Sequence, residues 1–471
     1  MTMALIRLAL PVYVELLTAV VAVGLIDLLW VSGLGDRAVA AVTIATSAEN
    51  LVLGVVLAVT TGTTVLVGRR DGRLPTAPVV RTAWLLCAAT GLAVAVAGVL
   101  LRAPLAGLFT DDATVAALTA GFLLVSMAGV PVFYAQSLAD GIFKGFGDTR
   151  TPMRNALLCN ALVVALDPLF IYGLALGVPG AALATVLARL VTLAVSLTLL
   201  LRRTSGAAPV PAAGGAAEQM GTGREATGPA ERATAERATA GREATGPAEP
   251  EPPARAHAVE ILRTGLPMSG DFLARALAGL LMVDIVGGLG VAALAGYGIG
   301  MKIMLAGVMA FYALRQAAMI RTARTGRAGP VLRYGLATGA AVAAVLNAVA
   351  APAAGLFTGD PAVAAAAVDF LRWMTLYLVP FGGLIALGGV LQAEGRGNRL
   401  LAATLAGFAV QLPLAALLGS VLGATGVWLS MAAGAALSLA VASAPRAGAR
   451  SNAPGRGPRS TRTAAGRPSA R

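Results

Sequence analysis

Charged residues are scarce in this chain: they make up 13% of its 471 residues, while hydrophobic residues make up 57%. A soluble domain carries roughly 25% charged residues, so the scarcity excludes an ordinary water-soluble enzyme. Cys87 and Cys159 are the only cysteines and fall in different apolar runs, which excludes a disulfide framework and a thiolate metal site. His257 is the only histidine and lies in a polar stretch, which excludes most histidine-based catalysis and metal binding. We therefore expect no cofactor and no metal.

What the chain does contain is apolar runs long enough to cross a bilayer, for which a helix needs about 20 residues. Twelve such runs lie near residues 8–32, 38–67, 79–102, 113–140, 152–175, 178–201, 259–288, 292–320, 330–356, 361–392, 399–420 and 424–445. The first run has no cleavage site of small residues behind a short apolar core, so we interpret it as a retained span and not as a signal peptide. The pattern predicts an all-α integral membrane protein with twelve transmembrane helices.

Two polar segments divide the chain. Residues 202–258 are rich in Ala, Gly, Glu, Arg, Thr and Pro and contain GREATGPAE twice, at 223–231 and 241–249. Because this composition cannot bury a core, we predict a disordered linker here and a disordered basic tail at 448–471. The expected domains are thus an N-terminal six-helix bundle, 1–201, and a C-terminal six-helix bundle, 259–447.

The net charge of +13 comes from Arg and Lys clusters between the apolar runs and in the tail. Membrane topology explains these clusters better than nucleic-acid binding does. Most of the short-loop positive charge follows the even-numbered spans: Arg69, Arg70, Arg73, Lys144, Arg150, Arg154, Arg321, Arg324, Arg327, Arg396 and Arg399. The positive-inside rule then places both termini and the linker in the cytoplasm, and we expect the protein in the cytoplasmic (inner) membrane.

The two halves repeat each other. Residues 104–112 read PLAGLFTDD and residues 352–360 read PAAGLFTGD. Gly33-Leu34-Gly35 likewise matches Gly288-Leu289-Gly290, and we align Gly145-x-Gly147 with Gly395-x-Gly397. Because each half has an even number of spans, the bundles share one orientation and are related by a pseudo-two-fold axis along the membrane normal. Two bundles with a site between or within them are the architecture that alternating access uses.

Two carboxylates fall within spans of the first half. Asp27 lies among apolar neighbours in the first span, and Asp167 lies in the fifth, where the second half has Leu412. Burying an uncompensated charge costs about 2.5–3.5 kcal/mol on insertion scales, so such residues indicate a functional site. Counted along their helices, both lie beyond the midplane, so we expect them to share one cavity and to take up and release protons. The alternative for Asp27 is a position in the headgroup layer.

Other polar positions join this hypothesis. Glu49 on the second span is a candidate third acid of the cavity, and Pro168 is expected to kink the fifth helix. Asp271 and Arg275 are four residues apart on one helix and are expected to form a structural ion pair. Aromatic faces near a carboxylate cavity suit an amphipathic cation.

Three stretches resemble the multidrug and toxic compound extrusion (MATE) transporters, in particular their prokaryotic DinF-like branch. They are LALPVYVELLTAVVAVGLIDLLWVSGLGDRAVAAV, GIFKGFGDTRTPMRNALLCNALVVALDPLFIYG and GVPGAALATVLARL. The resemblance covers about residues 4–201 and 259–445, and it implies that Asp27 and Asp167 are the functional carboxylates and that Asn160 and Thr185 line the N-lobe cavity. Two positions depart from the family pattern. Val163 stands where an Asn is often found, and Arg275 stands where the sodium-coupled branch has a Glu.

The resemblance, together with the presence of Asp167 in the first half where the second half has Leu412, predicts a secondary antiporter. We expect it to be monomeric and to export organic cations or drug-like amphiphiles in exchange for protons. No GxxxxGK[ST] run is present, so ATP is not the expected direct energy source. Three alternatives remain open at this point. They are a sodium-coupled exporter, an exporter of lipid-linked precursors or secondary metabolites from the same superfamily, and an integral membrane transferase. The last would need paired acidic motifs to hold Mg²⁺, and the adjacent pair Asp111-Asp112 lies in a repeated turn, so we expect the protein not to be an enzyme.

Overall fold

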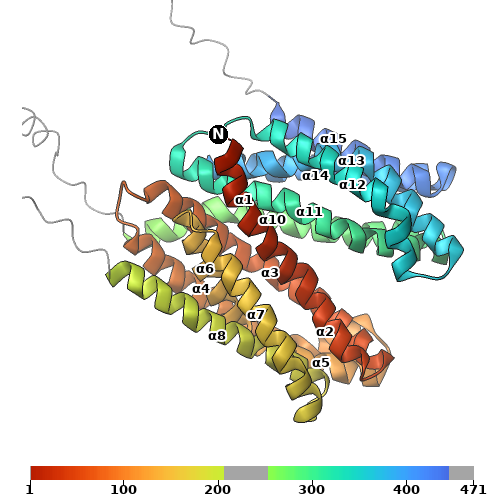
Figure 1. Cartoon of the computed structure of the whole chain (residues 1–471), viewed down its shortest axis with the longest axis horizontal. Coiled ribbons are helices and arrows are strands. Elements are labelled where there is room, and N and C mark those ends of the chain that lie inside the picture. Colours follow the sequence, from red (N-terminus) through yellow and green to blue (C-terminus); the bar gives the residue numbers. More distant parts are fainter. Residues whose placement is uncertain (1, 206–252, 445–471) are drawn as a thin grey trace, which may run out of the picture.

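The computed structural model describes residues 2–205 and 253–444, and the side chains of residues 2–4, 20–25, 27, 28, 51, 204 and 205 lie outside this description. The described chain is helical, with two π-helical segments (Figure 1). The elements are α1 (Thr2–Leu16), η1 (Leu17–Ala22), α2 (Val23–Ser32), α3 (Asp36–Arg70), α4 (Ala77–Phe109), α5 (Ala113–Ala128), α6 (Val130–Gly145), α7 (Arg150–Pro168), η2 (Leu169–Gly173), α8 (Val178–Ser205), α10 (Ala254–Gly287), α11 (Val291–Thr325), α12 (Val331–Phe357), α13 (Pro361–Ala393), α14 (Gly397–Leu422) and α15 (Ala424–Ser443).

Each predicted span coincides with one helix or with one interrupted helix. Among the described residues, nine helices are long and apolar enough to cross a membrane, and α5 with α6 forms a tenth span that is bent by 48°. The first span is interrupted by η1, and α10 carries charged residues along its length, as the sequence shows. With these two, the prediction of twelve transmembrane helices is confirmed.

The twelve spans form two bundles, the N lobe (α1–α8) and the C lobe (α10–α15), which lie side by side in Figure 1. Each lobe has its own apolar core. In the C lobe the rings of Tyr297 and Phe370 pack on Trp428, with centroids 5.7 and 4.9 Å from it. The start of α1 reaches across to the C lobe, where Leu5 packs with Leu314 and Ala317. The first helix thus contacts both lobes.

The internal repeat predicted from PLAGLFTDD and PAAGLFTGD appears as the same helix–turn–helix in each lobe. Asp112 caps α5 by accepting hydrogen bonds from the backbone N–H groups of residues 114 and 115, and Asp360 caps α13 by accepting from residues 362 and 363. Gly35 and Gly290, which precede α3 and α11, both have positive φ, at 96° and 112°. The N lobe and the C lobe therefore have matching turns at equivalent positions, as expected for two parallel repeats related by a pseudo-two-fold axis.

One alignment of the repeat was wrong. The sequence paired Gly145 with Gly395, but the glycines that adopt the left-handed conformation after the helices are Gly147 (φ 79°) and Gly395 (φ 75°). Their surroundings match as well, because Gly147 N–H donates to Lys144 O and Gly395 N–H donates to Gln392 O. Only a residue without Cβ takes this conformation readily, so backbone geometry identifies the equivalent glycines where a G-x-G pattern cannot.

The predicted linker boundaries also change. Residues 202–205 continue α8 and residues 254–258 begin α10, so the predicted linker is helical at both ends, while its interior, residues 206–252, lies outside the described residues. His257, which the sequence placed in this polar stretch, is 1% exposed. Its Nε2 lies 3.0 Å from Arg70 Nη2 at the end of α3. Hydropathy did not detect these turns because most of their described side chains are exposed and several are polar, while His257 is buried.

The cap at Asp112 leads to a stability prediction. Hydrogen bonds from the backbone of Val115 and Thr114, aided by Arg37, lower the pKa of Asp112. A lowered folded-state pKa contributes stability that is present above the unfolded pKa and is lost as the pH falls through the folded one. Asp112→Ala is therefore expected to lower the melting temperature at pH 7, and the difference from wild type should shrink on acidification. Asp112→Asn, which keeps an acceptor oxygen, should retain most of the cap.

The matched control for this cap is the adjacent Asp111→Ala, because Asp111 lies outside the cap bonds to residues 114 and 115. Thermal unfolding followed by intrinsic fluorescence in detergent between pH 7 and pH 3 measures all three variants. Equal melting temperatures for Asp111→Ala and Asp112→Ala at pH 7 would contradict the capping role.

Candidate functional site

The N-lobe residues predicted to be functional lie where α7 packs along the first span. Asn160 Nδ2 donates to Thr18 O at 3.0 Å, and Tyr172 Oη donates to Trp30 O at 2.5 Å. Both pairs are separated by 142 positions, so the two spans run parallel in constant register between these contacts.

This register places the backbones of the two predicted acidic residues at nearly the same level. The same offset sets Asp167 opposite Leu25, and Asp27 follows two residues later on α2, about 3 Å further along the helix axis. Asp167 is fully buried, and Asn160 lies seven residues before it on the same face of α7. The side chain of Asp27 lies outside the described residues, so its role remains a prediction supported by the position of its backbone.

The backbone on both sides of this level departs from the α-helix. Pro168 is the last residue of α7, and η2 follows it directly, while η1 separates α1 from α2. A proline removes one backbone donor and opposes the α-helical turn, and π-helical segments occur frequently at functional sites. At Pro168 the helix type changes from α to π, whereas Pro413 at the corresponding place of the repeat lies inside the continuous helix α14. The kink at Pro168 itself stays a prediction.

Glu49 and Thr185 lie on the neighbouring helices α3 and α8, and both are half-buried. Glu49 interacts electrostatically with Arg189, and the guanidinium of Arg189 lies 4.3 Å from the centroid of the Phe133 ring. Glu49 therefore lies within electrostatic reach of a cation of the same lobe.

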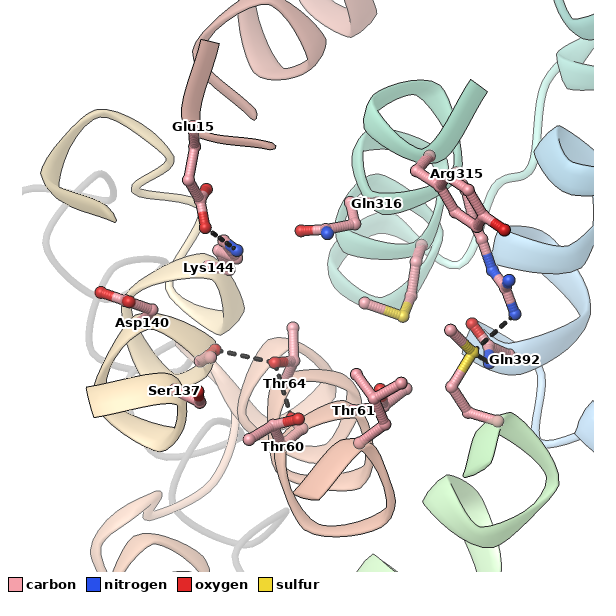
Figure 2. Close-up of a pocket in the computed structure, with 15 residues that line it drawn as sticks. Glu15, Thr60, Thr61, Thr64, Ser137, Asp140, Lys144, Arg315, Gln316 and Gln392 are labelled. Carbon is pink, nitrogen blue, oxygen red and sulfur yellow. Dashed lines mark hydrogen bonds and ion pairs between the residues drawn. The ribbon is translucent and has the colours of Figure 1, made fainter. Parts of the chain in front are cut away.

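A cavity of about 190 Å³ lies between the lobes (Figure 2). We call it the interlobe cavity. It is lined by Glu15, Leu57, Thr60, Thr61, Thr64, Ser137, Asp140, Gly141 and Lys144 from the N lobe, and by Met268, Tyr312, Arg315, Gln316, Met319 and Gln392 from the C lobe.

Repeat-related residues face each other across this cavity. Gly35 and Gly290 are 255 positions apart, and this offset relates Thr60 to Arg315 and Thr61 to Gln316. The offset of 248 between Gly147 and Gly395 likewise relates Lys144 to Gln392. The interlobe cavity therefore lies on the pseudo-two-fold axis, where each lobe contributes the same helix faces but different side chains.

Each lobe also buries an acid on its first helix, next to a cation. Glu15 in LPVYVE and Asp271 in LPMSGD occupy matching positions of the repeat. Glu15 Oε1 lies 2.6 Å from Lys144 Nζ. Asp271 pairs with Arg275 at 3.0 Å and with Arg315 at 3.4 Å. The predicted ion pair of Asp271 with Arg275 is thus confirmed and is extended by a second arginine.

The sequence analysis did not single out Glu15. A signal was present, because a carboxylate inside an apolar span was the reason for selecting Asp27, and Glu15 satisfies the same criterion in the same span. Lys144, which the sequence assigned to a connecting loop, lies in α6 and points into the cavity (Figure 2).

The lobes approach closely at the end of the bundles where α8 stops and α10 starts, which we call the linker end. A Cβ at Gly265 of α10 would lie 1.7 Å from Ala58 O of α3, and a Cβ at Gly62 would lie 2.1 Å from Ile261 O. Arg69 Nη2 donates to Ala393 O at 2.6 Å, and Arg324 pairs with Asp71 at 2.8 Å. Backbone contact and ion pairs therefore hold the lobes together at this end.

Two pseudo-symmetric six-helix bundles in a membrane, with a polar cavity between them, define a multi-pass membrane transporter. The chain belongs to the MatE family, whose sequence model matches residues 11–169 and 267–417. The resemblance to the MATE transporters is thereby confirmed.

Solved structures of the family share this fold. An outward-facing multidrug resistance MATE transporter of the MOP superfamily superposes with a TM-score of 0.78 at 22% identity, over 93% of each chain. A MOP superfamily transporter from Pyrococcus furiosus gives a TM-score of 0.77 at 22% identity, again over 93% of each chain.

Curated relatives match only in part. The FAD transporter of Shewanella oneidensis is 27% identical over 204 residues, which cover 42% of this chain and 45% of that protein. Protein DETOXIFICATION 45 of Arabidopsis thaliana is 39% identical over 82 residues, 17% of this chain and 14% of that protein. The chain therefore matches less than half the length of each of these two relatives.

Proposed function

We propose that this transporter is a secondary antiporter that exports organic cations or drug-like amphiphiles in exchange for protons. The observation that supports it best is that the fully buried Asp167 lies level with Asp27 on two parallel helices. The repeat has Leu412 in place of Asp167, so this acid is not required by the scaffold. A relative named as a probable multidrug resistance protein, YpnP of Bacillus subtilis, is 24% identical over 168 residues, 35% of this chain and 38% of that protein, and agrees with the proposed substrate class.

The mechanism uses the carboxylates as proton carriers. Protons from outside neutralise Asp27 and Asp167 while the substrate is released outward. Neutral carboxyls no longer attract a cation, and the π-helical segments η1 and η2 beside them allow the first span and α7 to change shape. The lobes then open at the linker end, where protons leave and the next substrate enters.

The orientation follows from the linker end. Its helix ends carry the arginines Arg69, Arg70, Arg324 and Arg396, so by the positive-inside rule we place this end, both termini and the linker in the cytoplasm and the protein in the cytoplasmic membrane. The closed linker end then corresponds to an outward-facing state.

Two alternatives are less well supported by the described side chains. Lipid-linked pyrophosphate would need several arginines in one cavity, yet Arg315 is the one arginine among the residues that line the interlobe cavity, and Arg275 is paired with Asp271. A sodium site on α10 would need an acidic residue at the position of Arg275. The Arg275 guanidinium instead forms an ion pair with Asp271, the neighbouring acid. Both facts favour a proton-coupled carrier of cations.

Reconstitution into proteoliposomes tests the proposal. A fluorescent organic cation is expected to move against its gradient when a pH difference is imposed, with an equal rate in sodium and in potassium buffer. Transport that requires a sodium gradient at constant pH would contradict proton coupling, and the absence of any cation transport by folded protein would contradict the substrate class.

A further inference from the structure

The interlobe cavity has walls of unequal charge. The N-lobe wall holds Glu15, which is paired with Lys144, whereas the C-lobe wall holds Arg315 (Figure 2). Asp140 also lines the N-lobe wall, but its carboxylate accepts from Gln136 Nε2 at 3.1 Å and points away from the C lobe. This site is separate from the carboxylate level in the N lobe, because Glu15 precedes Asp27 by twelve residues, about 18 Å of helix.

One residue of each wall carries a buried polar atom without a hydrogen-bond partner in the described structure. Glu15 is 9% exposed, and its Oε2 has no partner while Oε1 binds Lys144. Arg315 is 3% exposed, and its Nε has no partner. Leaving a buried polar group without a hydrogen bond is destabilising, so these atoms favour an occupant that supplies the missing bonds.

The remaining bonds of Arg315 are weak. Its Nη1 reaches Asp271 at 3.4 Å, and its Nη2 contacts the thioether sulfur of Met268, a poor acceptor. Asp271 is already occupied by Arg275 and by the Thr404 hydroxyl, which donates to it at 2.6 Å. Arg315 therefore retains donor capacity for an anionic group in the cavity.

The volume suits a small organic molecule. An engineered apolar cavity of about 150 Å³ holds benzene, and the interlobe cavity is about 190 Å³. Leu57, Met319 and Tyr312 also line the cavity and offer apolar surface to a short methylene chain.

We propose that the interlobe cavity binds a small zwitterion, an ammonium and a carboxylate joined by a short apolar chain. The ammonium donates to Glu15 Oε2, and the carboxylate accepts from Arg315 together with the side-chain amide of Gln392, which contacts the same Met268 sulfur as Arg315. Lys144 keeps its bond to Glu15 Oε1 and fixes the orientation of that carboxylate.

Calorimetric titration of the purified protein in detergent, without any gradient, tests this site. The probes are the ω-amino acids with four to eight carbons, and for each one the alkylamine and the alkanoate of the same length. Because a hydrogen bond to a charged group contributes about 1.5–3 kcal/mol, the best amino acid is expected to bind roughly 10- to 100-fold more tightly than either of its single-charge counterparts.

Substitutions assign the two ends. Glu15→Gln is expected to reduce zwitterion affinity at least tenfold while leaving alkanoate binding unchanged. Arg315→Gln should do the reverse, with alkylamine binding retained, and Arg315→Lys should recover part of the loss. Retained binding of the opposite probe shows that each variant is folded. Glu260→Gln and Arg263→Gln, at exposed positions of α10, are the matched controls and should bind like wild type.

Three outcomes would overturn the inference. One is an alkylamine or alkanoate that binds as tightly as the amino acid. Another is no binding by any probe to folded protein, which would mean that the cavity holds only water. The third is unchanged affinity in both Glu15→Gln and Arg315→Gln. Since no gradient is used, these results are independent of whether proton-coupled export occurs.

Discussion

Asp167→Asn and Asp27→Asn are each expected to reduce pH-driven export to the background of empty liposomes, a loss of at least tenfold. The amide is nearly isosteric with the carboxyl but cannot carry a proton between the two sides of the membrane. The amount of protein in the membrane should not fall, because a neutral amide is cheaper to bury than a carboxylate, whose burial costs about 2.5–3.5 kcal/mol on insertion scales.

Asp36→Asn is the matched control, since Asp36 is an exposed acid at the start of α3. Export is measured in proteoliposomes, and thermal unfolding of the same preparations reports folding. Wild-type rates in both Asp167→Asn and Asp27→Asn would rule out these residues as proton carriers. If only Asp27→Asn were active, Asp167 would carry the coupling alone.

Gly265→Ala is expected to prevent full closure of the linker end and to slow transport about tenfold. The added Cβ would lie 1.7 Å from the backbone oxygen of Ala58, so α3 and α10 must separate. Overpacking of this kind costs about 1–3 kcal/mol, which shifts the equilibrium between the two states by roughly 5- to 150-fold. Only the state closed at the linker end contains this contact, so the open state gains population.

A reporter cysteine measures this shift. With Cys87 and Cys159 replaced, Thr61→Cys on the interlobe cavity should be labelled faster from the cytoplasmic side in the Gly265→Ala background. The control is Gly279→Ala on the same helix, where a Cβ meets no atom within 4 Å. Equal labelling and transport in both glycine variants would show that the contact of Gly265 with α3 does not control closure.

Each lobe has a buried acid paired with a base, but the base comes from a different place in each lobe. Matching positions of the repeat hold Glu15 and Asp271, but the partner of Glu15 is a lysine on α6, whereas Asp271 has arginines on α10 and α11. Removing one partner of a buried ion pair is strongly destabilising. The two lobes therefore share an acid on the first helix but take its compensating charge from different helices.

The sequence by itself determined the membrane architecture. Twelve spans and the parallel repeat follow from local properties: a run of about 20 apolar residues must cross the bilayer as a helix, since no water is present to satisfy its backbone. The repeated turn that contains Asp111-Asp112 was visible for the same reason, whereas the capping of α5 by Asp112 and of α13 by Asp360 was seen only in the structure. The ion pair of Asp271 and Arg275 was predictable from a spacing of four residues.

Only the tertiary structure decided how distant segments meet. The pairing of Glu15 with Lys144 joins residues 129 positions apart, and the contact of His257 with Arg70 spans 187. The common level of Asp27 and Asp167 depends on the register of two helices, which is fixed by the bonds of Asn160 and Tyr172. Hydropathy and helical periodicity describe one helix at a time. Which faces pack together, and which polar atoms remain unsatisfied between them, depends on the packing of all twelve helices.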